Sequence, residues 1–156
     1  MPAFSENSKS KLATADARLQ LVMNKAIEFY DFSVVCGTRS KEAQDVAFSS
    51  GVSKVRYPHS KHNTLPSLAV DIYPYHPRYK SLTEDAIVIK RITEATGRTP
   101  TRARAFILEE YCMMAQAVKI AAKLVGVELR WGGDWDSDLD RLDQTFDDLA
   151  HFELVE

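Results

Sequence analysis

The stretch Ser60-Lys-His-Asn-Thr-Leu-Pro-Ser-Leu-Ala-Val-Asp71 decides how the chain must fold, together with a later stretch, Asp148-Leu-Ala-His-Phe-Glu153. Between them they supply two imidazoles, from His62 and His151, and the carboxylate of Asp71. Two histidines and one carboxylate are a ligand set that a catalytic zinc ion uses when its fourth position stays open for water. Because the three residues are distant in sequence, the fold has to bring them to one point.

A further carboxylate, Asp148, stands three residues before His151. A general base at that position could take a proton from metal-activated water as the water attacks a carbonyl group. The neighbouring Asp147 is the alternative base. The residue types therefore predict metal-assisted hydrolysis.

These motifs resemble the M15 zinc peptidases. The likeness lies in Ser60-x-His62, in Ala69-x-Asp71, and in an acidic residue three positions before a His that is followed by an apolar residue and Glu. The family holds D,D-carboxypeptidases, D,D-dipeptidases and the L-alanyl-D-glutamate endopeptidases of phage endolysins. The short chain and the segment Gly37-Thr-Arg39 are most similar to the endolysin branch. The spacing from His62 to Asp71 is longer than is usual in the family, which implies a longer turn between these residues.

The resemblance implies an α+β fold, in which a small antiparallel sheet of about four strands packs against helices, as in the M15 (hedgehog or D,D-peptidase-like) fold. The length of 156 residues predicts one domain, and the resemblance identifies residues 1–156 as a single zinc peptidase domain. The implied activity is that of an endolysin, a peptidoglycan hydrolase that cuts a stem peptide at the L-alanyl-D-glutamate bond. Two alternatives stay open, a D-alanyl-D-alanine carboxypeptidase of the same mechanism and a non-catalytic, metal-containing module that binds cell wall.

The resemblance also assigns roles to single residues. It selects Asp148 over Asp147 as the base. It gives Arg39 the role of binding a substrate carboxylate or stabilising the charged oxygen of the tetrahedral intermediate, which suits a guanidinium that stays charged.

Four more side chains are candidates for the surroundings of the site. Ser60 is expected to orient the first ligand or its loop by a hydrogen bond, and Glu153 to steady a ligand from behind. Trp131 and Trp135 flank a double glycine, where they either contact substrate or pack in the core.

Composition favours a globular protein outside the membrane. Hydrophobic residues make up 45% of the chain and charged residues 27%, and no apolar run is long enough to cross a membrane. The N-terminus lacks a basic segment followed by an apolar one, so we expect synthesis in the host cytoplasm and action on the wall after release across the membrane. We expect a monomer with no membrane insertion.

The net charge of −2 gives no general attraction to nucleic acid. A basic cluster at Arg98, Arg102 and Arg104 could bind phosphate, but the solvated start of a helix explains it better.

The segment from Asp134 to Asp140 has acidic residues at alternate positions, as a calcium-binding loop does, yet Leu139 and Thr145 replace the glycine and glutamate of that motif. A solvated acidic loop is therefore preferred, with weak calcium binding as the alternative.

The two cysteines, Cys36 and Cys112, are interpreted as reduced core thiols, since neither lies in a motif that lowers its pKa.

Hydrophobic periodicity and turn residues predict the helices and strands of the chain. Helices are expected over 8–30, 40–49 and 101–125, strands over 32–36, 69–73, 127–131 and 151–155, a loop over 51–68, and a short helix or irregular insertion over 81–97. Pro74 is expected to end the second strand.

Overall fold

The computed structural model describes residues 2–155. Its helices are α1 (Glu6–Leu12), α2 (Ala17–Ala26), α3 (Lys41–Ser49), α4 (Ala86–Thr96) and α5 (Pro100–Val125), with one 3-10 turn, η1 (Lys61–Asn63). Its strands are β1 (Phe32–Cys36), β2 (Ala69–His76), β3 (Lys80–Ser81), β4 (Leu129–Trp131) and β5 (His151–Leu154). The expected α+β class, with a small antiparallel sheet packed against helices, is confirmed.

The sheet has the strand order β1-β2-β5-β4, and the two-residue β3 pairs with the far end of β2. All of these pairs are antiparallel. The strand that comes last in the sequence, β5, is thus inserted between β2 and β4. This order places the two quoted stretches of sequence on neighbouring strands.

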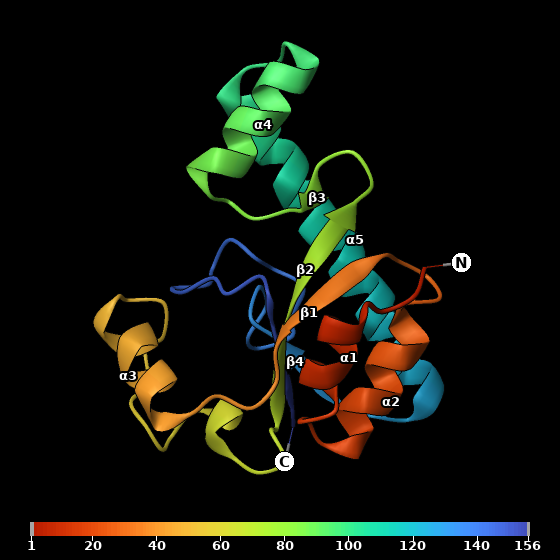
Figure 1. Cartoon of the computed structure of the whole chain (residues 1–156). Coiled ribbons are helices and arrows are strands. Elements are labelled where there is room, and N and C mark those ends of the chain that lie inside the picture. Colours follow the sequence, from red (N-terminus) through yellow and green to blue (C-terminus); the bar gives the residue numbers. More distant parts are fainter. Residues whose placement is uncertain (1, 156) are drawn as a thin grey trace.

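One face of the sheet is covered by α1, α2 and α5, while α3 and the long loops lie on its other side (Figure 1). Successive side chains of a strand point to opposite faces. On β2 this directs Val70 and Ile72 into the core, where both are fully buried, and leaves Asp71 on the opposite face. On β5 it buries Phe152 against the helices and turns His151 the other way. Alternation therefore puts both site residues on the face without the long helices.

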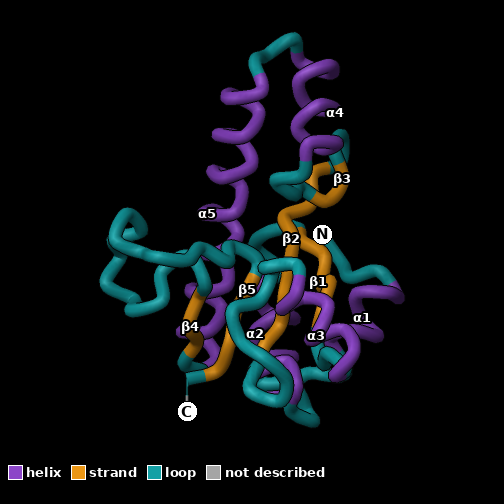
Figure 2. The backbone as a smooth tube through the Cα atoms, turned by 90° about the vertical axis from the view of Figure 1, so that its left-hand side faces the viewer, coloured by secondary structure: helices purple, strands orange, loops and turns teal. Residues whose placement is uncertain are grey.

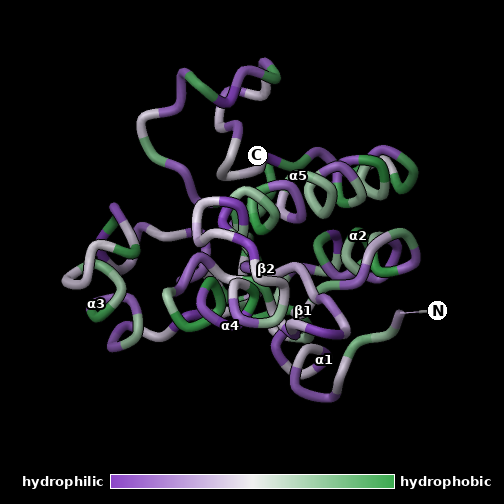
Figure 3. The backbone as a smooth tube through the Cα atoms, turned by 90° about the horizontal axis from the view of Figure 1, so that it is seen from above, coloured by the Kyte–Doolittle hydropathy of each residue, from purple (hydrophilic) through white to green (hydrophobic). Residues whose placement is uncertain are grey.

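The core between sheet and helices is built mainly from α2 and α5, which lie side by side (Figure 3). Their fully buried residues include Leu19, Val22, Met23, Ile107, Met114 and Val118. Beyond the sheet, the N-terminal half of α5 continues as one arm of a helical hairpin with α4 (Figure 2). None of the described helices is both long and apolar enough to cross a membrane.

The single helix expected over 8–30 is wrong, because the structure has two helices, α1 and α2, with a break at residues 13–16. Asp16 caps α2 by accepting a hydrogen bond from the Arg18 amide. The backbone at the break pairs instead with Ser67, whose carbonyl accepts from the Asp16 amide at 2.8 Å. A tertiary contact thus overrides an apolar stripe that continues across the break.

One other expectation needed correction. Strand β2 does not end at Pro74 but runs on to His76, because the Pro74 carbonyl still accepts a hydrogen bond from the Leu82 amide and Pro74 pairs with Phe32 in β1. Of the two alternatives for 81–97, the short helix is confirmed, as α4 spans Ala86–Thr96 and is capped by Gly97 in a left-handed conformation.

Candidate active site

Asp71 and His151 are direct partners in the β2–β5 ladder. The Asp71 Oδ1 atom lies 3.0 Å from His151 Nδ1 and 3.0 Å from His62 Nε2, and the two ring nitrogens lie 3.2 Å apart. The three side chains are thus brought together, each with one donor atom directed at a common point. His62 and His151 are buried, and Asp71 is largely so.

His62 reaches this point from the 3-10 turn η1, whose start is fixed by a reciprocal cap. The Ser60 hydroxyl accepts a hydrogen bond from the His62 amide at 3.3 Å, and the Asn63 side chain accepts one from the Ser60 amide at 3.2 Å. The Arg39 amide donates to the His62 carbonyl at 2.8 Å, which joins the turn to the chain after β1. Ser60 therefore orients the backbone of His62 directly.

The other nitrogen of each ring is also held. His62 Nδ1 lies 2.7 Å from the Gly37 carbonyl, and His151 Nε2 lies 2.9 Å from Glu153 Oε2. Glu153 in turn pairs with Arg130. These contacts fix which nitrogen of each ring faces the common point. Gly37 is required here, because a Cβ would lie 2.4 Å from the Lys11 carbonyl oxygen.

The charges at the site are coupled strongly. Burial raises the pKa of Asp71, but hydrogen bonds from His151 and His62 outweigh it and hold that pKa far below its usual range. Burial lowers the pKa of His62, yet the Asp71 carboxylate raises it to about 10. The pKa of His151 is also raised, against burial, by Asp71 and Glu153. The neighbouring carboxylates thus favour the protonated form of both rings, whereas a metal ion binds the neutral imidazole.

Asp148 lines the same cleft. The turn from Asp148 to His151 is closed by a hydrogen bond from the His151 amide to the Asp148 carbonyl at 3.0 Å. The Asp148 amide donates to the Gly132 carbonyl at 2.7 Å, and a Cβ on Gly132 would lie 2.3 Å from the Asp148 carbonyl oxygen. Burial, and then the charge of Asp71, raises the pKa of the Asp148 carboxyl. The carboxylate makes no hydrogen bond within residues 2–155, which leaves it free for a reacting molecule.

Arg39 is held at the edge of this cluster by two acceptors. One guanidinium nitrogen donates to Asp71 Oδ2 at 2.9 Å and another to Gln44 Oε1 at 3.2 Å. Gln44 is completely buried, and its amide donates to the Ser53 hydroxyl at 2.9 Å and the Val55 carbonyl at 2.8 Å. Gln44 thus connects Arg39 to the loop after α3, a connection that periodicity along α3 did not reveal.

The cleft over the site has a volume of about 400 Å³. Trp135 lines it and donates from its ring nitrogen to the Phe146 carbonyl at 2.6 Å. Trp131 does not line it, because its ring is buried, stacks on Phe152 and donates to the Leu149 carbonyl. The sequence interpretation did not single out several other lining residues, among them Lys54, Tyr73, Arg130 and Phe146.

Cys36 lies beside this cluster as the β1 partner of Asp71. With His62 and Asp71 it forms a group whose donor atoms could hold a metal ion. Its sulfur, however, is 3.8 Å from His62 Nδ1, the nitrogen that faces away from His151. Burial raises the pKa of the thiol, but His62 outweighs it and the net pKa is lowered, which the sequence interpretation did not expect. Cys36 and Cys112 are both free thiols.

The acidic loop is less solvated than expected. Asp136 and Asp138 are exposed, but Asp134 is buried and pairs with Lys119 at 2.8 Å. Ligand atoms of these three aspartates lie within 4.8 Å of one another, a grouping that could hold a metal ion.

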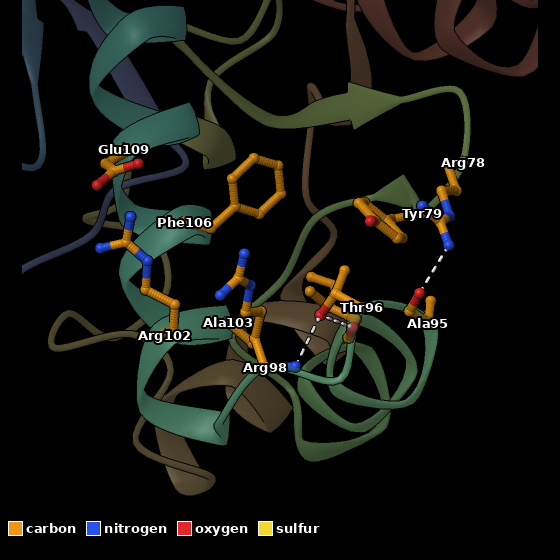
Figure 4. A pocket seen from close by; sticks show the side chains of 10 residues that line it. Arg78, Tyr79, Ala95, Thr96, Arg98, Arg102, Ala103, Phe106 and Glu109 are labelled. Carbon is orange, nitrogen blue, oxygen red and sulfur yellow. Dashed lines mark hydrogen bonds between the residues drawn. The ribbon is translucent and has the colours of Figure 1, made fainter.

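A second cavity, of about 720 Å³, lies between α4 and α5, away from this site (Figure 4). Arg98 and Arg102 line it, and Arg78 closes one side by donating to the Ala95 carbonyl at 2.7 Å. It contains none of the residues of the histidine and aspartate cluster. The alternatives for the basic cluster, phosphate contact or a solvated helix start, therefore concern a separate surface.

Comparison with known proteins gives three matches. Residues 2–102 match the model of a family described as phage L-alanyl-D-glutamate peptidase. Over 160 aligned residues the chain is 31% identical to the L-alanyl-D-glutamate peptidase of Escherichia phage T5, with 97% of each chain covered. The crystal structure of the Serratia marcescens L-Ala D-Glu endopeptidase ChiX matches with a TM-score of 0.66 at 22% identity, covering 98% of this chain and 90% of that one. At this identity the structural likeness concerns the fold.

Proposed function

The chain belongs to the phage L-alanyl-D-glutamate peptidase family, and on that premise we propose that it acts on peptidoglycan as an endolysin through a zinc ion held by His62, Asp71 and His151. Its activity is that of a peptidase, the cleavage of the bond between L-alanine and D-glutamate. The resemblance drawn from its motifs is thereby confirmed. The zinc ion and the roles of single residues are the proposal.

One observation carries the zinc assignment, the approach of three donor atoms to within 3.0–3.2 Å of one another. Bonds from zinc to histidine nitrogen and carboxylate oxygen measure about 2.0–2.2 Å, so donors on a tetrahedral ion lie about 3.3–3.6 Å apart. A small outward movement of the side chains suffices to admit the ion. The donor types fit zinc, and the hydrogen bonds to Gly37 and Glu153 support the required ring orientations.

When bound, zinc supplies a Lewis acid and lowers the pKa of a water molecule toward neutrality. Asp148 takes the proton of the attacking water and passes it to the amine of D-glutamate as the peptide bond breaks. The raised pKa of its buried carboxyl supports this role, because a base with a pKa closer to neutrality also serves well as the acid that returns the proton. The lack of a hydrogen-bond partner among the described residues leaves its oxygens available.

Arg39 acts beside the metal by holding Asp71 in its orientation and by placing a permanent positive charge where the carbonyl oxygen becomes negative. Ser60 orients His62 through the cap of η1, and Glu153 orients His151. Trp135 forms part of the wall against which the peptide lies.

We also propose that residues 1–156 act as one domain and as a monomer, which reaches the wall after release across the host membrane. A single cluster of buried hydrophobic residues, from Leu12 to Leu154, supports the single domain. Light scattering coupled to gel filtration tests the monomer, and a dimer mass would contradict it.

The test of the function uses a defined stem peptide and mass spectrometry of its fragments. Protein treated with a chelator should be inactive, and addition of zinc should restore cleavage between L-alanine and D-glutamate. Release of D-alanine alone would indicate a carboxypeptidase instead. Equal cleavage with and without metal would contradict the zinc assignment.

A further inference from the structure

The cleft is lined by cationic side chains that differ in what they already bind. The Arg39 guanidinium is engaged by Asp71 and Gln44, and that of Arg130 by Glu153. Lys54 also lines the cleft, but its ammonium makes no ion pair or hydrogen bond with any residue from 2 to 155. The ammonium instead lies over the aromatic ring of Phe146, 5.2 Å from the ring centroid. Lys54 thus offers the cleft a charge that protein carboxylates do not already neutralise.

The position of Lys54 is fixed relative to the candidate metal site, although its side chain is exposed. The residues on either side of it, Ser53 and Val55, are both hydrogen-bonded to the buried amide of Gln44. Gln44 accepts a hydrogen bond from Arg39, and Arg39 donates to Asp71. A continuous series of hydrogen bonds therefore runs from the candidate ligand Asp71 to the Ser53 hydroxyl on one side of Lys54 and to the Val55 carbonyl on the other.

Phe146 approaches Lys54 from another segment of the cleft wall. Its carbonyl accepts the hydrogen bond of the Trp135 ring, which ties this segment to the wall of the cleft. An ammonium over the face of an aromatic ring is attracted to it only weakly at an exposed position. The ring can thus hold the lysine side chain over the cleft while the ammonium remains available to bind an anion.

The substrate supplies that anion. Cleavage between L-alanine and D-glutamate breaks a bond to the nitrogen on the α-carbon of D-glutamate, and the same carbon carries a free carboxylate when the stem continues through the side chain. That carboxylate must enter a cleft already lined by Asp71, Asp148 and Glu153. Asp71 and Glu153 are paired with Arg39 and Arg130, but the Asp148 carboxylate has no ion pair among residues 2–155, and its like charge opposes binding unless a cation compensates for it.

We propose that Lys54 binds the α-carboxylate of the D-glutamate residue and so makes the enzyme select stem peptides in which this group is an acid and not an amide. The inference rests on the proposed function and names the part of the substrate that the cleft recognises. Arg39 is less suited to this contact, because Asp71 and Gln44 already accept two of its hydrogen bonds. A lysine ammonium on a flexible stem can also follow the carboxylate as the product leaves.

The test compares two synthetic stem peptides that differ in one group, the α-carboxylate or the α-carboxamide of D-glutamate. The wild-type enzyme loaded with zinc is expected to cleave the acid with a kcat/KM about tenfold above that of the amide, as for one charge-assisted contact. Lys54→Gln should lower cleavage of the acid to the level of the amide and leave the amide unchanged. Lys54→Arg should keep most of the preference, and Phe146→Leu should reduce it.

Lys90→Gln serves as the matched control, because it removes one exposed positive charge on α4, and Lys90 does not line the cleft. It should leave the rates on both peptides unchanged. A loss of equal size on both peptides in Lys54→Gln would assign Lys54 to the loop structure and overturn the inference. So would a wild-type enzyme that cleaves both peptides equally. Failure of the wild type to cleave either peptide would instead contradict the function itself.

Discussion

Asp71 and His151 face each other across an antiparallel pair of strands, with Oδ1 and Nδ1 3.0 Å apart. Their positions are set by backbone hydrogen bonds of the ladder, and their neighbours Val70 and Phe152 are buried on the opposite face. The candidate metal site is therefore anchored by the core, and single substitutions within it should change chemistry more than they change folding.

Substitutions of a candidate ligand and of the candidate base should differ in their effect on zinc content. His151→Ala removes a donor and is expected to lose zinc and activity together. Asp148→Ala should keep zinc but lose about two to four orders of magnitude in kcat, the usual contribution of a general base. Metal content by mass spectrometry and peptide cleavage measure both. His76→Ala, at the other end of β2, is the control and should keep zinc. Equal zinc content and equal activity in all variants would exclude the proposed roles.

Glu153→Gln tests the support of His151. The amide keeps the size of the side chain but no longer offers His151 a charged acceptor, and it weakens the pairing with Arg130. Zinc affinity should fall about 10- to 100-fold, as for other partners of metal-bound histidines. Competition with a chromophoric chelator measures it. Glu128→Gln, at an exposed position next to β4, should have no effect. If the zinc affinity is unchanged in Glu153→Gln, Glu153 does not support His151 and contributes only to the structure of the sheet.

The ion pair between buried Asp134 and half-buried Lys119 should make stability depend on pH. Burial raises the pKa of Asp134, but the hydrogen bond and charge of Lys119 outweigh it, so the folded pKa lies below the unfolded one. The stabilisation is then present above the unfolded value of about 3.9 and is lost as the pH falls through the folded value. Wild type should therefore exceed Asp134→Asn in melting temperature at neutral pH, and the difference should shrink below about pH 4. A difference constant over this range would contradict the assignment.

Gln44→Leu should loosen the loop that follows α3. The substitution removes the hydrogen bonds that the Gln44 side chain makes to the Ser53 hydroxyl, the Val55 carbonyl and Arg39, and each lost hydrogen bond destabilises by about 0.5–1.5 kcal/mol. Urea unfolding measures the loss, and faster hydrogen exchange should be confined to residues 53–55 and their neighbours. Gln20→Leu, which removes one hydrogen bond to the Ala15 carbonyl, is the comparison and should be milder. Equal effects of the two substitutions would argue against a special role of Gln44.

The fold class followed from the family resemblance, and the convergence of His62, Asp71 and His151 followed from the ligand set that a catalytic metal requires. It did not reveal the break between α1 and α2, since the contact with Ser67 that imposes the break lies far along the chain. The roles of Gln44 and Lys54 were not predicted from the sequence for a similar reason. Nothing in α3 or its following loop distinguishes a buried glutamine or a cleft lysine from their solvated counterparts, and their roles depend on partners in other elements.

The insertion of β5 between β2 and β4 has a consequence for when the enzyme becomes competent. His62 and Asp71 come from segments that precede α4 and α5, whereas His151 and Asp148 arrive with the strand that completes the sheet. Without that strand in place, the polypeptide has only two of the three proposed protein ligands and lacks the proposed proton acceptor. On the proposed assignment, a molecule in which this strand is not docked would be inactive toward the wall.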